Sequence, residues 1–374
     1  MKICHVTSAH DSNDVRILNK ECVSLAKKEN NDVYLIARGG SYEYKGVQVI
    51  GVGEIPAGRI KRILKGTKIV FEKAMSLDAD IYHLHDPELL LYAKKFAQNG
   101  KKVIFDSHEL YYMQILEKNY LPKFVRKFIA DLYYFIECRA CHYLSGAVFP
   151  CEIKGTHPFA DKVKNCVYLD NVPLIDEVMS NENFEMKSSI EPTVCCIGSL
   201  TRERGIQQLI QACYKANVKL VLGGDFSPTE FEEEMKNSKE FETVDYKGFC
   251  SRKQVMEIYR QSTIGASTIL PIGQYPIAGN LPTKVYEFMM HGLPFIISDF
   301  PYNKKMIKEW QCGIIVNPYD VGEIAEAICY LINNPDVAKI MGEKGRVAIE
   351  EKFNWTIEEK ELYNLYEMVM KEEQ

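Results

Sequence analysis

Short apolar runs alternate with amphipathic stretches along most of the chain, and this pattern predicts alternating strands and helices. In the first part, apolar runs predict strands at residues 2–7, 32–38, 47–52, 81–84, 103–106 and 147–150. Amphipathic stretches predict helices at residues 15–28, 59–76, 88–98 and 121–144. Such alternation is typical of a parallel sheet with helices on both faces, which binds ligands beyond the carboxyl ends of its strands.

The alternation stops at residues 171–192, which are polar and rich in Asn, Glu and Ser. It then resumes, with strands predicted at 194–198, 219–223, 244–247, 264–267 and 295–297, and helices at 206–216, 252–261, 321–333 and 358–371. We therefore expect an α/β protein of two doubly wound, Rossmann-like domains facing a cleft. The domains are expected at 1–170 and 193–354, with a linker at 171–192 and a C-terminal helix in 355–374 that returns toward the first domain.

The composition is that of an ordinary globular protein, with 46% hydrophobic and 26% charged residues. No apolar run reaches the ~18–20 residues of a membrane-spanning helix, and the N-terminus has no secretory leader pattern, so a cytoplasmic location is expected. The twelve cysteines are scattered, as reduced cysteines are. Cys138 and Cys141 form a lone C-x-x-C beside His142, without the second pair that a zinc site needs, so no metal site is predicted.

The formal net charge of −5 is unevenly distributed, because residues 1–170 carry 25 Lys and Arg against 20 Asp and Glu. A basic first half predicts an anionic partner. The cationic side chains gather in two regions, one of which is mixed with aromatic residues: Arg59, Lys61, Arg62, Lys65, Lys68 and Lys73, and then Lys118, Lys123, Arg126 and Lys127 with Tyr111, Tyr112, Tyr120, Phe124 and Phe128. This mixture fits an anionic membrane surface or a lipid-diphosphate acceptor. A solvated helix face over core aromatics is the alternative.

The most informative segment, residues 280–298, reads as a loop, a helix and a buried strand. The helix is expected to start at Pro282 or Thr283, with Thr283 as N-cap, and to stop before Gly292. A helix N-terminus attracts anions, and Lys284 in the first turn opposes the helix dipole unless an anion is bound there. Glu287, about one turn further on, could accept two ribose hydroxyls. The alternative is a surface Lys–Glu pair.

Two other strand ends carry candidate chemistry. Gly198 permits close backbone approach, and Arg202 and Arg204 follow it in the loop before a helix, where a guanidinium fork could meet a diphosphate. A solvated turn is the alternative. In the first domain, residues 83–86 and 106–109 place histidines at the ends of two strands, which indicates either a site or structural histidines.

Together these segments resemble the GT-B-fold, family 4 (group 1) glycosyltransferases, which are retaining, metal-independent and use nucleotide-sugar donors. The resemblance covers nearly the whole chain and is carried by residues 10–17 with 20–21, 83–86, 106–109, 198–205, 246–249 and 282–289. No single motif is decisive, but their order and spacing are specific.

The resemblance implies roles for individual residues. Glu287 matches the second glutamate of the family's pair, which holds the donor ribose, and Arg204 matches the basic residue that binds the donor diphosphate. Gly248 and Phe249 match the loop that reads the base, and His108 matches the histidine near the donor sugar. The remaining matches are Asp14 and Arg16 in the first loop, which closes over donor and acceptor, and Ser199, Gly279, Asn280, Leu281 and Thr283 around the nucleotide sugar.

Two residues depart from the family's pattern. The first glutamate of the pair would fall at Gly279, and the usual arginine after the glycine would fall at Ser199. The first departure puts donor-sugar handling in doubt, and the second removes one diphosphate contact. Our hypothesis is that Lys284 supplies the lost charge from the opposite wall of the same pocket.

The sequence therefore predicts transfer of a sugar from a nucleoside diphosphate to a glycan or lipid-linked acceptor, with the anomeric configuration retained. No metal or other cofactor is expected, and attachment to the inner face of the membrane is an open question. A sugar-nucleotide epimerase and a non-catalytic nucleotide-sugar-binding protein remain alternatives. A nicotinamide dehydrogenase lacks support because no G-x-G-x-x-G follows the first strand, and nucleic-acid binding is disfavoured by the acidic net charge.

Overall fold

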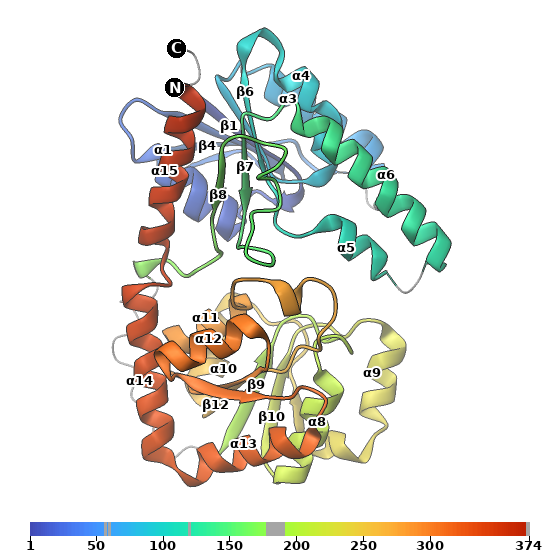
Figure 1. Cartoon of the computed structure of the whole chain (residues 1–374), viewed down its shortest axis with the longest axis vertical. Helices are drawn as coiled ribbons and strands as arrows, with labels where there is room; N and C mark the ends of the chain where they lie inside the picture. The colour runs from blue at the N-terminus through green and yellow to red at the C-terminus, as the bar shows by residue number, and fades with distance from the viewer. Residues whose placement is uncertain (56–57, 59–60, 119–120, 177–190, 372–374) are drawn as a thin grey trace. The chain divides into compact units, whose positions relative to one another are not determined.

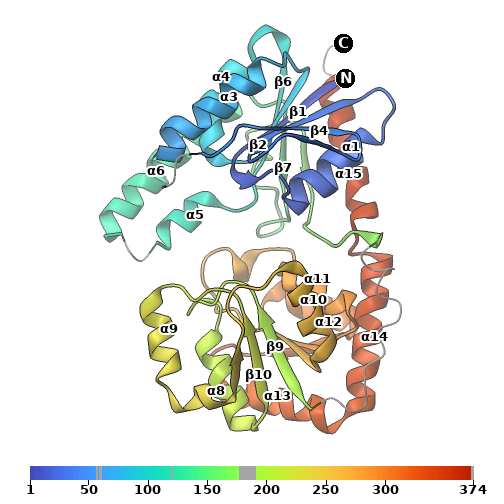
Figure 2. The same cartoon turned by 180° about the vertical axis from the view of Figure 1, so that it is seen from behind.

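A parallel β-sheet covered by helices on both faces forms the centre of each of two units (Figures 1 and 2). The computed structural model describes residues 1–55, 58, 61–118, 121–176 and 191–371. The first unit comprises Met1–Asn171 together with Thr356–Gln374, and the second comprises Val172–Trp355. The predicted fold class, two Rossmann-like α/β domains, is confirmed. Most of the predicted linker, residues 177–190, lies outside the described residues, as do Arg59 and Tyr120.

The sheet of the first unit has eight strands in the order β3-β4-β2-β1-β5-β6-β7-β8, and all neighbours are parallel except β3 and β4. The strands are β1 (Lys2–Asp11), β2 (Asp32–Arg38), β3 (Tyr42–Tyr44), β4 (Val47–Gly51), β5 (Ile81–Leu84), β6 (Lys102–Asp106), β7 (Gly146–Phe149) and β8 (Cys166–Tyr168). Strands β2 and β5 flank β1 on opposite sides, so the order reverses between β1 and β5. Ligands of doubly wound sheets bind at such a reversal.

The helices of the first unit are shorter and more irregular than the pattern predicts. They are η1 (Val15–Cys22), which is of the wide π type, α1 (Val23–Ala26), η2 (Arg62–Gly66), α3 (Thr67–Met75), η3 (Pro87–Tyr92), α4 (Ala93–Phe96), η4 (Gln98–Gly100), α5 (Tyr111–Leu116) and α6 (Lys123–Cys141). The single helices expected at 15–28 and 88–98 are each built from two or more pieces. Strands β3 and β8 and helix α5 were not predicted.

The last helix, α15 (Trp355–Lys371), packs on the first unit beside α1, as both views show (Figures 1 and 2). Glu359 accepts hydrogen bonds from Ser24 at 2.9 Å and from Lys27 at 3.0 Å, and Tyr363 donates to the Ser24 carbonyl at 2.9 Å. Tyr366 is buried and reaches the strands of the sheet. The end of the chain thus completes the interior of the first unit.

The sheet of the second unit has six parallel strands in the order β11-β10-β9-β12-β13-β14. They are β9 (Thr193–Ile197), β10 (Lys219–Gly223), β11 (Val244–Tyr246), β12 (Ile264–Ser267), β13 (Phe295–Ser298) and β14 (Gly313–Val316). The helices are α8 (Ile206–Ala216), α9 (Thr229–Lys236), η5 (Lys239–Thr243), α10 (Arg252–Gln261), η6 (Tyr275–Ile277), α11 (Thr283–Met290), α12 (Pro301–Trp310), α13 (Val321–Asn333) and α14 (Pro335–Glu351). The pattern had not predicted α9, α12, α14 and β14.

The continuous apolar run of β9 follows from burial on both faces. Val194 and Cys196 pack into one core cluster, and Cys195 and Ile197 pack into the other. Because successive side chains point to opposite faces, a strand between two helical layers must be apolar at every position. All twelve cysteines are free. None of the helices in the described part of the chain combines the length and hydropathy needed to cross a bilayer.

Candidate functional site

The carboxyl edge of the second sheet is open and lined by glycine. Its order reverses between β9 and β12, and β9 ends at Gly198, whose φ is +128°. Gly224 follows β10 with φ +119°, and a Cβ there would lie 1.9 Å from the Gly198 carbonyl oxygen. The positive φ disfavours a side chain at both positions, and at Gly224 a side chain would also clash with the main chain. Both glycines are half-buried at the reversal point, where a phosphate could approach the main chain.

Lys284 lies directly against this glycine edge. A Cβ at Gly198 would be 3.7 Å from Lys284 Nζ, and the ammonium group contacts Cys196 Sγ at 3.4 Å. None of the carboxylates in the described residues forms an ion pair with Lys284. The helix begins at Thr283, within the expected range, but Pro282 occupies the N-cap position and the Thr283 side chain caps nothing. The predicted cap was wrong because Pro282, with φ −57° and ψ 136°, already turns the chain into the helix.

Arg204 lies in the turn after β9, and its guanidinium stacks 4.8 Å from the centre of the Tyr275 ring. Its backbone N–H contacts the Thr201 carbonyl oxygen at 3.2 Å, which tightens the turn before α8. Ser199 is exposed beside Gly198. Tyr275 begins the short helix η6, and the chain continues from η6 through Gly279 to α11. Arg204 therefore contacts the segment that leads to Lys284.

Glu287 is one turn beyond Lys284, and both of its oxygens are engaged. Arg252 pairs with Oε1, and the buried Tyr259 hydroxyl donates to Oε2 at 2.7 Å. Burial and the Glu287 carboxylate raise the pKa of Tyr259 well above its ordinary value, so the phenol stays a donor. Arg252 is 49% exposed and can move away, which would free Oε1 for a sugar hydroxyl.

The other predicted donor-site residues divide between surface and core. Phe249 is 77% exposed, and Gly248 has φ +63° with open space around it. Gly279 and Asn280 are half-buried. Leu281 is 2% exposed and belongs to the core, so only its backbone is available to a ligand. Its N–H contacts the Tyr286 hydroxyl at 3.3 Å.

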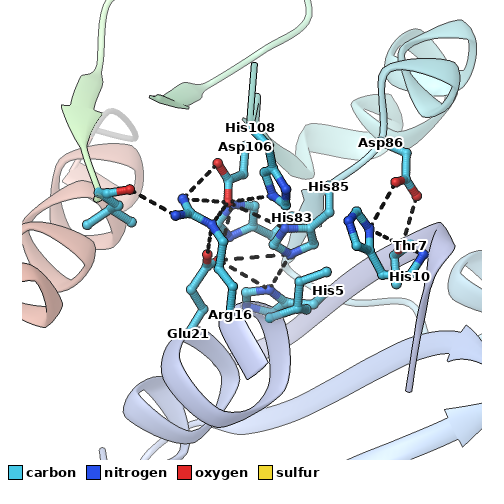
Figure 3. Close-up of polar contacts among 12 residues, drawn as sticks. His5, Thr7, His10, Arg16, Glu21, His83, His85, Asp86, Asp106 and His108 are labelled. Atoms are coloured by element: carbon cyan, nitrogen blue, oxygen red, sulfur yellow. Dashed lines mark hydrogen bonds and ion pairs between the residues drawn. The ribbon is translucent and has the colours of Figure 1, made fainter. Parts of the chain in front are cut away.

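In the first unit, the structure places Arg16 in the interior instead of a loop over a substrate. Arg16 is the second residue of helix η1, is 7% exposed, and donates to both oxygens of Asp106 at 3.1 Å (Figure 3). It also donates to the Leu169 carbonyl at 3.0 Å and lies 3.2 Å from Glu21 Oε1. Asp14 caps the helix by accepting from the Ile17 N–H at 2.9 Å. Both residues thus make contacts within the first unit, and their roles toward donor and acceptor stay predictions.

Two partly exposed histidines lie side by side near the reversal point of the first sheet. His108 Nε2 is 3.2 Å from Asp106 Oδ2, and the His108 and His10 rings are 5.2 Å apart (Figure 3). His10 Nδ1 is 3.2 Å from Asp86 Oδ1. Burial alone would lower the pKa of His10, but the Asp86 carboxylate raises it above its ordinary value. His10 and Asp86 both lie in segments that carry the family resemblance. The sequence alone assigned neither residue a role, because only the fold brings residue 10 next to residue 86.

A largely apolar cavity of 340 Å³ opens beside His10 and Asp86. Its polar wall includes Arg62 and Glu88, which form a 2.8 Å ion pair, and its apolar wall is made of Ile63, Leu91, Ile115, Ile129, Leu132 and Ile136. Helix α6 closes this wall and also exposes a stripe of apolar side chains. Phe124, Phe128, Leu132 and Phe135 are 78%, 69%, 48% and 60% exposed, so they are not the core aromatics that the alternative assumed.

The part of the chain that the structure describes contains two groups of side chains arranged as metal ligands could be, and neither includes a cysteine. They are His5, Glu21, His83 and His85, and His85, Asp106 and His108. The first group is fully buried. Sequence reasoning did not find it, because Glu21 and Tyr366 reach these histidines only through the fold.

Comparison with known proteins shows which family model and which relatives the chain resembles. Residues 180–348 match the family model described as glycosyl transferases group 1. The chain is 21% identical over 217 residues to alpha-D-kanosaminyltransferase of Streptomyces kanamyceticus, covering 55% of this chain and 54% of that protein. An uncharacterised glycosyltransferase of Methanocaldococcus jannaschii is also 21% identical, over 202 residues. The chain thus spans about half the length of these curated relatives.

Two solved structures are similar over their whole length. The sucrose-phosphate synthase of Thermosynechococcus elongatus has a TM-score of 0.76 at 14% identity, covering 100% of both chains. Anabaena HepE, solved with UDP and glucose, has a TM-score of 0.69 at 12% identity, covering 98% of this chain and 99% of that one. The chain therefore has the GT-B fold, and residues 180–348 match the glycosyl transferases group 1 model. The predicted fold is confirmed and the match agrees with the predicted group 1 family, whereas glycosyl transfer by the whole chain, family 4 and retention stay predictions.

Proposed function

We propose that this protein transfers a sugar from a nucleoside diphosphate sugar to a glycan or lipid-linked acceptor, with retention of the anomeric configuration, during synthesis of a surface polysaccharide or glycoconjugate. The observation that carries the proposal is Lys284 against the Gly198 edge. It is a half-buried cation without an ion-pair partner among the described carboxylates, at the point of the sheet where nucleotides bind in doubly wound folds. The UDP and UDP-glucose complexes of Anabaena HepE support a nucleotide sugar as donor.

In this proposal the donor diphosphate lies over Gly198 and the N-terminus of α11. Lys284 and Arg204 neutralise the negative charge that grows on the diphosphate as its bond to the sugar breaks. The N–H groups at the N-terminus of α11 add to this electrostatic stabilisation. Lys284 takes over the contact that an arginine at position 199 would make. We propose no metal at this site, because the two cations supply the charge.

Glu287 is proposed to hold the donor ribose. Its Oε2 stays bonded to Tyr259, and Oε1 exchanges Arg252 for a ribose hydroxyl. Gly248 and Phe249 are proposed to meet the base, since Phe249 offers an exposed ring and Gly248 an unobstructed backbone. The loop at Gly279, Asn280 and Leu281 would contact the donor through its main chain.

The transfer itself is proposed to follow a front-face route, in which the acceptor hydroxyl attacks from the side of the departing phosphate. The leaving phosphate oxygen takes the acceptor proton, and the new glycosidic bond keeps the original configuration. His108 positions the donor sugar, and its Nε2 is held by Asp106. His10 extends the same polar surface toward the 340 Å³ cavity.

The acceptor is proposed to be lipid-linked and presented by an anionic membrane surface. Two features support this choice: the apolar wall of the cavity, and the exposed stripe Phe124, Phe128, Leu132 and Phe135, which lies next to Lys123 and Lys127. A helix that exposes aromatic side chains beside lysines is typical of binding at a membrane interface.

The experiment that tests the proposed function begins with a panel of nucleotide sugars screened for thermal stabilisation, because a ligand of the folded state raises the unfolding temperature. The best donor is then incubated with lipid-linked and free glycan acceptors, and the product is analysed by mass spectrometry and by NMR of the anomeric proton. A product of donor and acceptor with retained configuration is expected. Conversion of the donor without acceptor, or binding without turnover, would contradict the proposal.

A further inference from the structure

Four buried side chains in the first unit converge on one point close to His108. His5 comes from β1, and His83 from β5 pairs with it in register, while His85 follows β5 two residues later on the same face. Glu21 reaches them from helix η1. All four side chains are 0% exposed. Figure 3 shows them close together beside Arg16 and Asp106.

Each histidine turns one ring nitrogen inward. His5 Nδ1, His83 Nε2 and His85 Nε2 lie 4.0, 3.9 and 3.9 Å from Glu21 Oε2. The outer nitrogens of His5 and His83 are 3.3 and 3.0 Å from the Tyr366 hydroxyl. His85 Nδ1 lies 3.5 Å from Asp106 Oδ2, without a hydrogen bond between them. Outer hydrogen-bond partners such as Tyr366 orient histidines around a metal ion.

The inner atoms are poorly satisfied without an ion. His83 Nε2 and Glu21 Oε2 are fully buried and have no hydrogen-bond partner. His5 Nδ1 and His85 Nε2 are 2.8 Å apart, so one of the two must donate to the other. Buried polar atoms without partners are rare in folded proteins and call for a specific explanation, such as a bound ion.

We infer that His5, Glu21, His83 and His85 form a binding site for a divalent first-row transition metal ion, most simply Zn²⁺. Three imidazole nitrogens and one carboxylate oxygen are ligands that Zn²⁺ accepts in a closed tetrahedral site, with bonds of about 2.0–2.2 Å. Ligation requires the ring proton of His5 to lie on Nε2, facing Tyr366, and those of His83 and His85 to lie on Nδ1. It also requires the contact between His5 and His85 to open. Glu21 Oε2 moves inward at the same time.

The site has a structural and positioning role, because none of its ligands is exposed to a substrate. It ties β1, β5 and η1 together and, through Tyr366, fixes α15. It also orients His85, which holds Asp106, which in turn holds His108. The inference is independent of the proposed donor site, so either can fail without the other.

The test measures the metal content of untagged protein by inductively coupled plasma mass spectrometry after exhaustive dialysis. Wild type is expected to keep about one zinc or other first-row metal ion per chain. Glu21→Gln and His83→Gln are expected to lose most of it, whereas the exposed controls Glu29→Gln and His142→Gln keep it. Glu21→Gln is expected to fold, because the amide has nearly the same size and shape as the carboxyl group, and circular dichroism checks this.

A second measurement tests the site even if the metal is lost during purification. Wild type refolded with Co²⁺ is expected to show the strong visible absorption of a tetrahedral cobalt site, and folded Glu21→Gln is not. Chelator should lower the unfolding temperature of wild type but not that of Glu21→Gln. Folded wild type that holds no metal and takes up no Co²⁺ would overturn the inference, and so would equal metal content in wild type, Glu21→Gln and His83→Gln.

Discussion

Replacing Lys284 by methionine removes its charge and keeps most of its length. The ammonium group lies in the first turn of α11, where the helix dipole disfavours a cation by about 0.3–1 kcal/mol. Because none of the described carboxylates pairs with it, its loss should leave the ligand-free protein equally stable or up to about 1 kcal/mol more stable. If Lys284 instead stabilised the fold, its replacement would lower the free energy of unfolding of the ligand-free protein.

The effect on catalysis should be large. Loss of one preorganised group that faces a developing oxyanion costs about 2.7–4 kcal/mol, which corresponds to about 10²–10³-fold. We expect kcat/KM of Lys284→Met to fall by about that factor, and the thermal stabilisation by the nucleoside diphosphate to shrink. The variant thus combines unchanged or higher free-state stability with much lower activity.

The assay pairs steady-state kinetics with thermal unfolding, with and without nucleotide. Lys253→Met is a matched control, because Lys253 is an exposed lysine in the first turn of α10, in the same unit. Its activity should stay within about twofold of wild type. Equal activity of the two variants, or clear destabilisation of Lys284→Met without nucleotide, would refute the reasoning.

The other predictions concern both units. His108→Ala should lower kcat far more than it weakens nucleotide binding, measured by calorimetry, and equal losses would argue against a positioning role. Phe124→Ser with Phe128→Ser should reduce co-sedimentation with anionic liposomes about tenfold or more, since two exposed rings are lost from the stripe, and unchanged sedimentation would exclude this face as the docking surface. Burial, reinforced by nearby arginines, lowers the pKa of His291 from 6.5 to about 3. Between these two pH values the unfolded state binds a proton that the folded state does not. This histidine therefore lowers the free energy of unfolding as the pH falls from about 6.5 toward 3. Nitrogen-15 NMR at about pH 5 should find the His291 ring neutral, and a ring that is protonated at that pH would contradict this.

Most strands were predictable because burial on both faces forces continuous apolar runs, as in β9 and β10, whereas β3, β8 and β14 were not predicted. Helix α14 was missed for a physical reason: it carries Gly342 and Gly345 in its interior, which weaken the helical pattern. A Cβ at Gly342 would lie 1.9 Å from the Gly292 carbonyl oxygen, so close packing between segments explains the glycine. That contact is invisible in the local sequence.

The candidate site was predictable to the extent that its parts are local. Lys284 stood out because a cation at a helix N-terminus contradicts the dipole, and the structure places it at Gly198. Arg16 was misjudged, because its partner Asp106 is 90 residues away and turns a loop arginine into a buried one. The buried cluster depends on Tyr366, which contacts His83 across 283 residues of sequence. Pairings over such distances follow only from the fold.

The most direct test of the central claim is a crystal structure with the nucleoside diphosphate that stabilises the protein most. We predict that the β-phosphate lies within hydrogen-bonding distance of Lys284 Nζ, over the Gly198 edge and the N-terminus of α11. A diphosphate bound elsewhere, with Lys284 still resting on Cys196 and touching no phosphate oxygen, would contradict the account.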